Sequence, residues 1–302
     1  MLKPAPGSGA AGPPVTPYLG LAVGVVAVSF GAIFARMAGE APPLVIAAFR
    51  VGLAALVLVP LALLRSRREL AGLSLRDGLM AMLAGLFLAL HFATWITSLS
   101  YTSVTNSVVL VNTNPLWVGL LTPFIARERI PWMAKVSIGV SVLGGAVIGY
   151  GSLSIGGDAL RGDFLALCGG ICAAVYLLLG RSIRQKLSLL AYITVCYGSA
   201  AVILWIFVLG MGMPVTGFRP ETTAAFWALA LVPQLIGHTC YNWSLKWFAA
   251  STIAVSLLGE PIGSTILAYF LFGEGVTVPK IVGGGLILTA IYLSGLSEAK
   301  KE

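Results

Sequence analysis

The sequence predicts an all-α integral membrane protein in which ten transmembrane helices form two five-helix repeats of inverted topology around a central cavity. Of its 302 residues, 58% are hydrophobic and only 10% are charged, which is too few polar side chains to cover a soluble globule of this size. Ten apolar stretches have the roughly 18–25 residues that a helix needs to cross ~30 Å of hydrocarbon. A repeated segment also relates the two halves of the chain.

The repeat joins positions that lie 146 residues apart. Each copy consists of an apolar helix, a charged turn that contains a glutamate, and a second apolar helix. The matched pairs are Pro115 and Pro261, Leu121 and Leu267, Phe124 and Phe270, Glu128 and Glu274, Val136 and Val282, and Gly139 and Gly285. If each copy contributes five spans, the odd number turns the second half upside down in the bilayer, as in many secondary transporters.

The predicted spans follow one another with short connections. In chain order they cover residues 18–37, 43–64, 78–99, 103–125, 131–150, 162–179, 187–211, 222–243, 251–272 and 278–296. Residues 1–16, rich in Pro, Gly and Ala, are expected to form a flexible cytoplasmic tail. The first repeat is expected to cover residues 17–150, and the second residues 151–302 with a short cytoplasmic tail. The stretch 18–37 is interpreted as a span and not as a cleaved signal peptide, because its apolar run is long and the repeat requires it.

Basic residues set the expected orientation. One face of this arrangement would carry 14 of the 19 lysines and arginines, the other face four, and Arg50 lies within a span. Because positive charge is retained on the cytoplasmic side, both termini are predicted to be cytoplasmic and the protein to lie in the inner membrane. The basic residues sit in short turns where they meet anionic lipid headgroups, so nucleic acid is not expected as a partner.

Polar and aromatic side chains within spans mark the expected substrate site, because unpaired polar groups in hydrocarbon cost free energy. His91 and Trp95 are one turn apart, and Gln234, His238, Tyr241 and Asn242 form a comparable stripe. The six expected substrate contacts are His91, Trp95, Asn112, Tyr176, His238 and Tyr241. A lining rich in aromatic and amide groups suits a zwitterionic or amphipathic solute. Ordinary helix-to-helix packing remains the alternative for each residue.

Two prolines predict matching kinks near the bilayer midplane. Pro115 follows Asn114 and Pro261 follows Glu260, and a proline removes a helical hydrogen bond. Both positions are therefore expected to act as hinges. Glu260 is the one acidic residue deep in a predicted span, which makes it either a proton carrier or a structural carboxylate paired with Arg50.

Arg50 lies ~10 Å inside the second predicted span. It could neutralise a substrate carboxylate, or it could extend toward the outer surface and pair with Glu40. The structural role is the preferred interpretation. Glu128 and Glu274 are expected to stabilise turns.

The pattern resembles the EamA family of the drug/metabolite transporter superfamily over residues 17–297. The residues that carry the resemblance are Glu260-Pro261 with Glu274, Ser98-Leu99-x-Tyr101-Thr102-Ser103-Val104, Asn114-Pro115, Glu128-Arg129 and Phe49-Arg50. The sequence His-Phe-x-x-Trp at 91–95 is similar to that of family members that export amino acids, including the YddG-like exporters of aromatic amino acids. The resemblance implies ten helices in two inverted repeats, alternating access and export.

The sequence therefore favours a secondary transporter that exports small organic metabolites, most of all amino acids. A polyspecific drug or toxin exporter is the alternative, and a channel or an intramembrane enzyme is a more remote one. The two histidines lie on separate spans, and the four cysteines are all within spans, so no catalytic residue, disulfide, metal site or cofactor is predicted. The sequence leaves the oligomeric state open.

Overall fold

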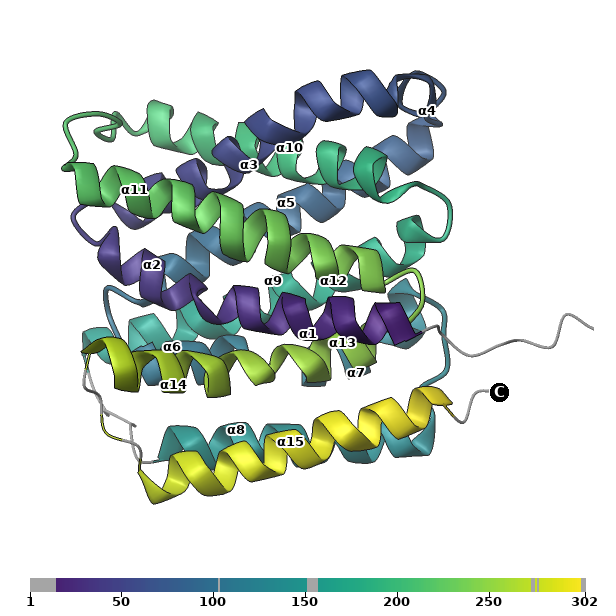
Figure 1. The fold of residues 1–302 in the computed structure, drawn as a ribbon, viewed down its shortest axis with the longest axis vertical. Helices are drawn as coiled ribbons and strands as arrows, with labels where there is room; N and C mark the ends of the chain where they lie inside the picture. Colours follow the sequence, from purple (N-terminus) through teal and green to yellow (C-terminus); the bar gives the residue numbers. More distant parts are fainter. Residues whose placement is uncertain (1–14, 103, 151–156, 273–274, 276, 300–302) are drawn as a thin grey trace, which may run out of the picture.

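The computed structural model describes residues 15–102, 104–150, 157–272, 275 and 277–299, most of which form helices (Figure 1). In chain order the elements are α1 (Val15–Ser29), α2 (Gly31–Met37), α3 (Pro43–Arg65), α4 (Arg67–Ala71), α5 (Leu75–Ser98), α6 (Val104–Val111), α7 (Asn114–Ile125), α8 (Trp132–Tyr150), α9 (Asp158–Arg184), α10 (Leu189–Gly210), α11 (Pro220–Leu229), the π-helix η1 (Ala230–His238), α12 (Thr239–Ser244), α13 (Ala250–Leu257), α14 (Gly259–Phe272) and α15 (Val278–Ala299). Most of the expected tail 1–16, the C-terminal residues 300–302 and Glu274 lie outside the described residues.

The ten apolar stretches all fall on helices, either on one element or on a run of two or three. In the described part of the chain, eight helical segments are long and apolar enough to cross a membrane. Two further helices, α8 and α15, contain shorter apolar segments, Trp132–Val147 and Ile281–Ser297. The chain is thus an all-helical protein with multiple membrane spans.

Two of the long segments break immediately before the matched prolines. The first break is a gap of two residues between α6 and α7, and Pro115 is the second residue of α7. The second break is at Leu258, between α13 and α14. Proline lacks an N–H and its ring clashes with the carbonyl four residues earlier. Those carbonyls belong to Val111 and Leu257, the last residues of α6 and α13, which explains why the helices break there. At the C-terminal ends of α6 and α13, hydrogen bonds reach back three residues instead of four. Thr113 N–H donates to the Leu110 carbonyl (3.2 Å), and Leu258 N–H donates to the Val255 carbonyl (3.1 Å).

The eighth span departs from the regular α-helix expected over residues 222–243. Its middle is the π-helix η1, which contains Pro233, flanked by α11 and α12. A π-helical turn holds more residues than an α-helical one and rotates the side chains that follow it. Gln234 and His238, both buried, belong to this stretch.

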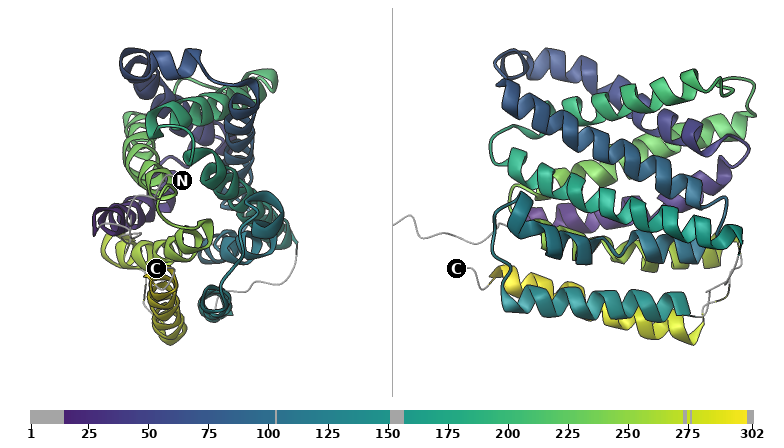
Figure 2. Two further views of the ribbon diagram at one scale, coloured as in Figure 1. Left: turned by 90° about the vertical axis from the view of Figure 1, so that its right-hand side faces the viewer. Right: turned by 180° about the vertical axis from the view of Figure 1, so that it is seen from behind.

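The two halves pack against each other through a regular set of partners (Figure 2). Helix α3 packs on α10, α5 on α9, α7 on α13, and α8 on α15, while α1 packs on η1 and α12. The α3–α10 and α5–α9 pairs, together with α1 and α12, build the main body, and the α8–α15 pair stands at its edge (Figures 1 and 2).

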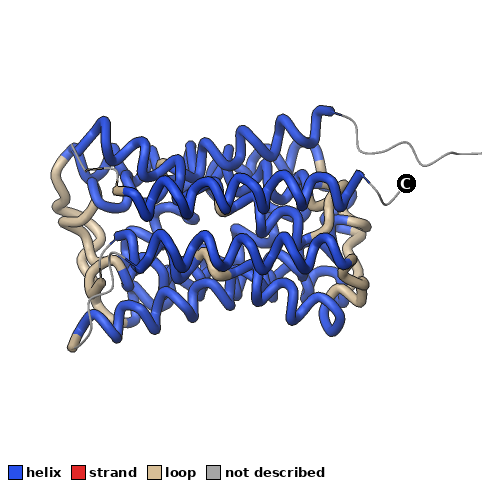
Figure 3. The backbone as a smooth tube through the Cα atoms, turned by 90° about the horizontal axis from the view of Figure 1, so that it is seen from below, coloured by secondary structure: helices blue, strands red, loops and turns tan. Residues whose placement is uncertain are grey.

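Loops gather at the two ends of the bundle (Figure 3), and polar contacts tie the halves together at both. At one end lie the turns that were expected on the basic face, joined by Lys186 to Asp77 (2.8 Å) and Arg181 to Glu128 (3.0 Å). At the other end, Arg219 pairs with Glu40 (2.6 Å). Glu128 therefore pairs with the second half of the chain in addition to lying in its own turn.

Candidate substrate-binding site

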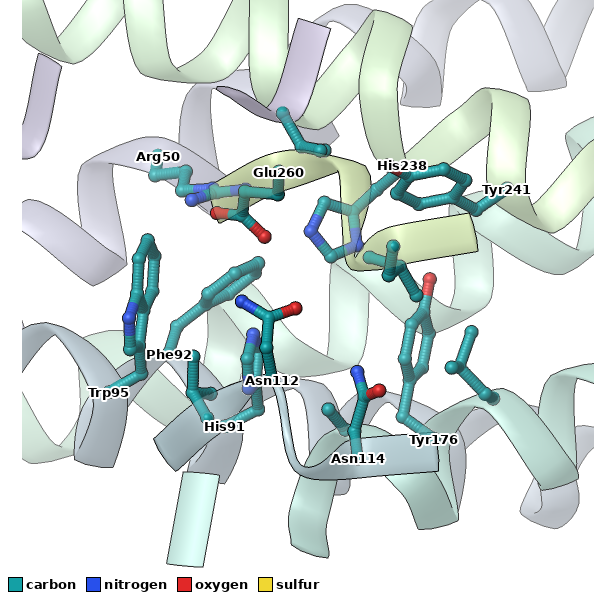
Figure 4. A pocket seen from close by; sticks show the side chains of 15 residues that line it. Arg50, His91, Phe92, Trp95, Asn112, Asn114, Tyr176, His238, Tyr241 and Glu260 are labelled. Atoms are coloured by element: carbon teal, nitrogen blue, oxygen red, sulfur yellow. The ribbon is translucent and has the colours of Figure 1, made fainter. Parts of the chain in front are cut away.

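A small chamber lies between the two halves, and all six predicted substrate contacts line it together with Glu260 (Figure 4). Its walls come from α1, α3, α5, α9, η1, α12 and the two broken segments. The other lining residues are Val28, Arg50, Phe92, Val111, Asn114, Ala173, Leu177 and Leu257. The centres of water molecules can occupy ≈ 40 Å³ of it, which is space for about three waters. A larger solute can enter only if the helices move.

The broken helices bring polar groups to the chamber. Asn112 lies in the gap between α6 and α7, Asn114 begins α7, and Glu260 is the second residue of α14. Asn114 and Glu260 occupy matched positions of the repeat, so both halves contribute a polar residue at this position beside the break. The amide of Asn112 approaches the Glu260 carboxylate from the first half.

Arg50 points into the chamber, contrary to the prediction that it extends outward to Glu40. Its side chain is buried, and its Nε donates to the Gln234 Oε1 at 3.0 Å. The guanidinium carbon lies 4.0 Å from the centre of the Phe92 ring, a cation–π contact. Glu40 pairs instead with Arg219. The prediction was wrong because η1 places an amide oxygen deep in the protein, where it satisfies the arginine without solvent.

Arg50 and Glu260 face each other and interact electrostatically across the chamber (Figure 4). They come from opposite halves of the chain. The Nη1 of Arg50 is buried and has no hydrogen-bond partner, so one nitrogen of the guanidinium lacks a protein acceptor. A positive and a negative group are thereby presented to any solute that enters.

Aromatic rings surround this charged pair. The His91 ring is stacked parallel to that of Trp95, with centroids 6.0 Å apart and an interplanar angle of 3°. The His238 ring lies 5.2 Å from Phe92 in an edge-on arrangement and 6.1 Å from both Tyr176 and Tyr241. These faces can hold an apolar or aromatic group.

His91 serves the packing role and the cavity role at once. Its Nδ1 lies 3.0 Å from the Gly169 carbonyl of α9, and since a carbonyl only accepts, Nδ1 carries the hydrogen. The neutral ring then has a free acceptor at Nε2. The hydrogen bond between helices is thus present, and a contact of His91 with the substrate stays a prediction.

A second layer of side chains holds Tyr176 in place. Asn242, one residue beyond Tyr241 on α12, donates to the Tyr176 hydroxyl at 2.6 Å and to the Tyr197 hydroxyl at 3.0 Å. Asn242 is fully buried and lies behind the lining. It links α9, α10 and α12 and fixes the orientation of the Tyr176 ring.

Several polar atoms of the lining are buried and lack a hydrogen-bond partner. They are Arg50 Nη1, Trp95 Nε1, Asn114 Oδ1, His238 Nδ1 and the Tyr241 hydroxyl. Leaving such groups unpaired costs about 1–3 kcal/mol each, so their concentration in one place indicates a site for a polar solute or water. Among the described residues, no group of three or more His, Cys, Asp or Glu side chains is placed to hold a metal ion.

The sequence predictions missed Phe92 and the inward orientation of Arg50. Phe92 directly follows His91, but a phenylalanine suits a lipid-facing surface as well as the interior, so its residue type gave no signal. The signal for Arg50 was its depth alone, which does not determine the direction of the side chain. The hinge roles of Pro115 and Pro261 stay predictions, although the breaks beside them are clear.

Relatives of this chain are described as transporters. An uncharacterized transporter of Archaeoglobus fulgidus is 28% identical over 221 residues, 71% of this chain and 75% of that protein. One from Clostridium kluyveri is 24% identical over 82% of this chain and 81% of its own length. The uncharacterized transporter YdfC of Bacillus subtilis is 23% identical over 93% and 90%.

A solved crystal structure and a family model cover nearly the whole chain. The crystal structure superposes with a TM-score of 0.76 over 96% of this chain and 100% of the other, at 16% sequence identity, which establishes a shared fold. The model of the EamA-like transporter family matches residues 16–150 and again residues 160–296, one match in each half. The chain therefore belongs to the EamA-like transporter family and consists of two EamA repeats.

Proposed function

We propose that the protein is a secondary transporter that exports amino acids, aromatic ones included, across the inner membrane by alternating access. The observation that carries this proposal is the opposed pair Arg50 and Glu260 within an aromatic chamber. An α-amino acid has a carboxylate and an ammonium group on one carbon. The free Nη1 of Arg50 suits the carboxylate, and the Glu260 carboxylate suits the ammonium group.

The aromatic walls provide for the side chain of the substrate. The stacked His91–Trp95 pair and the Tyr176 ring present flat faces beside the charges. Asn112, His238 and Tyr241 add polar contacts that accommodate the rest of the molecule. A purely apolar drug would leave the unpaired polar atoms of the lining, such as Arg50 Nη1 and the Tyr241 hydroxyl, without partners, which disfavours the polyspecific drug exporter.

The packing of the halves supports ten membrane helices in two inverted repeats. A two-fold relation that exchanges the repeats maps α3 onto α10, the segment α6–α7 onto α13–α14 and α8 onto α15, and these pairs are in contact. It also maps the α5–α9 contact onto the contact of α1 with η1 and α12. The basic turns that share one end of the bundle would then face the cytoplasm together with both termini.

The small volume of the chamber and the contacts between the halves at both ends support alternating access. Ion pairs join the two halves at each end, Lys186–Asp77 at one and Arg219–Glu40 at the other. Opening one end requires its cross-half contacts to break while those at the other end persist. The helix breaks beside Pro115 and Pro261 provide hinges at the level of the chamber. Glu260 is our candidate for carrying a proton, since it is a buried carboxylic acid in the path of the substrate.

Counterflow into proteoliposomes tests the proposal. Vesicles loaded with one unlabelled amino acid should take up the same labelled amino acid, and a panel will rank the aromatic and aliphatic ones. His91→Ala and Tyr176→Ala should lower uptake, and unchanged rates would remove these residues from the site. Active movement of a lipophilic cation, with no counterflow of any amino acid, would favour the drug exporter.

A pH gradient tests the coupling role of Glu260. If protons drive export, an imposed gradient should change the final accumulation of the amino acid. Glu260→Gln should abolish that change, while counterflow continues at a raised KM. A gradient that alters only the rate would exclude Glu260 as a coupling residue.

A further inference from the structure

A second cavity, separate from the chamber, runs along the outside of the bundle between α1, α13–α14 and α15. Its volume is ≈ 610 Å³, far larger than that of the chamber. It exists because α15 packs mainly on α8, so that the α8–α15 pair stands away from α14 (Figure 2). No residue proposed for substrate binding lines it.

The chemistry of this groove is almost wholly apolar. Val26, Ile266 and Leu288 line it with half or more of their surface exposed. The hydroxyls of Ser29 and Ser256 donate to carbonyls of their own helices, Ser29 to Val25 (2.8 Å) and Ser256 to Thr252 (2.9 Å). The hydrogens of these two serines are therefore engaged within the protein, and the groove suits a hydrocarbon better than a polar ligand.

The length of the groove matches one leaflet of a bilayer. Along α1 it extends from Tyr18 to Phe30, which is about 18 Å at 1.5 Å per residue. A hydrocarbon core of ~30 Å gives each leaflet about half of that thickness. The groove begins at the end of the bundle where α1 begins and α15 ends, which is the end that holds the basic turns. A lipid chain entering from that leaflet would lie along its full length.

We propose that this groove binds one acyl chain of a bilayer lipid from the leaflet at the basic end of the protein. The bilayer supplies this ligand at high concentration to every outward-facing groove. The acyl chain would fill the space between α14 and α15, which make few contacts with each other.

The wall between groove and chamber is a single layer of helix. On α1, Val28 faces the chamber and Val25 the groove, and across the break Leu257 and Glu260 face the chamber whereas Gly259 faces the groove. A Cβ atom at Gly259 would lie 2.5 Å from Val25 Cγ1, so α14 and α1 are in close contact here. An acyl chain in the groove would support this wall at the point where the helix breaks.

Photolabelling in vesicles tests the proposal. The full-length protein is reconstituted in phosphatidylethanolamine and phosphatidylglycerol with a small fraction of phosphatidylethanolamine that carries a diazirine in its acyl chain. After irradiation, adducts are mapped by mass spectrometry. We expect adducts on α1, α14 and α15 at a rate well above that at Leu56 and Val202, exposed residues on other outward surfaces.

Two glycines of α15 provide a matched pair of variants. A Cβ atom would meet nothing within 4 Å at either Gly295, which lines the groove, or Gly285, which does not. Gly295→Leu should lower groove labelling by about tenfold, because the leucine displaces part of the chain. Gly285→Leu should leave it unchanged. If Gly295→Leu fails to fold, Val26→Trp serves as a second obstruction.

Either of two results would overturn the proposal. One is labelling of the groove that equals that of the reference surfaces or that persists in both obstructed variants. The other is a groove protected from the lipid label by a second copy of the chain, detected as a cross-linked dimer through α1 or α15. Neither result bears on amino-acid counterflow, so this test is independent of the proposed function.

Discussion

Replacing Arg50 by glutamine gives the most direct test of the chamber. The substitution removes the donor that we assign to the substrate carboxylate, and a hydrogen bond to a charged group is worth about 1.5–3 kcal/mol. The KM for an amino acid should therefore rise roughly 10- to 150-fold. The same change removes the cation that faces the buried Glu260, and breaking a buried charge pair costs about 3–5 kcal/mol of folding stability. Glu260→Gln removes the other member of the pair, so it should raise the KM and lower the folding stability by comparable amounts.

The double variant Arg50→Gln/Glu260→Gln separates binding from stability. Removing both charges leaves no lone buried ion, so the thermal unfolding temperature should return close to that of the parent. The KM should stay high, because both contacts to the zwitterion are gone. Counterflow in proteoliposomes gives the KM, and thermal unfolding of the purified protein gives the stability. Arg65→Gln, an exposed arginine at the end of the same helix, is the control. Recovery of both KM and stability in the double variant would refute the reasoning, since the pair would then be only structural.

Two further predictions concern residues outside the lining. Asn242→Leu leaves the hydroxyls of Tyr176 and Tyr197 without their donor; the unfolding temperature should fall, by the equivalent of about 1–3 kcal/mol per group, and the KM should rise. Parent-like values of both would show that Asn242 does not position Tyr176. At the end of the bundle opposite the basic turns, the hydrogen bond from Arg219 holds the pKa of the Glu40 carboxyl below its ordinary value. The stabilisation is then complete above the ordinary glutamate pKa of about 4.3 and is lost as the pH falls through the lowered value, so Glu40→Gln should flatten the acid side of a plot of unfolding temperature against pH. Equal slopes for parent and variant would contradict this.

Much of the fold followed from the demands of the bilayer. A membrane span requires about 20 consecutive apolar residues, so helices were predictable from composition and length. A polar group within a span must avoid lipid, which is why His91, Asn112 and His238 could be expected to face an interior cavity. The 146-residue offset identified Asn114 and Glu260 as matched positions, and in the structure both residues line the same chamber.

The rest depended on contacts that no local pattern encodes. The depth of Arg50 in its span was evident, but its direction depends on Gln234, which lies 184 residues away. The π-helix that places Gln234 has one sequence signal, Pro233, and proline also occurs in α-helices that merely kink. Rotation of a helix about its axis is decided by packing between elements, and this is where the prediction for Arg50 failed.

The repeat makes the scaffold symmetric but leaves its chemistry asymmetric. Both halves break at the same level, yet one presents the neutral Asn114 and the other the acidic Glu260. The cation that faces Glu260 comes from α3, and the matching position on α10, 146 residues later, is Cys196. One charge pair therefore serves a scaffold with two equivalent helix breaks. If the two halves exchange conformations during transport, the inward-open and outward-open states are related by symmetry in their backbone but not in the surroundings of the pair. Binding of a zwitterion or of a proton at Glu260 can then change the free energies of the two states by different amounts, which is the condition for a ligand to shift such an equilibrium.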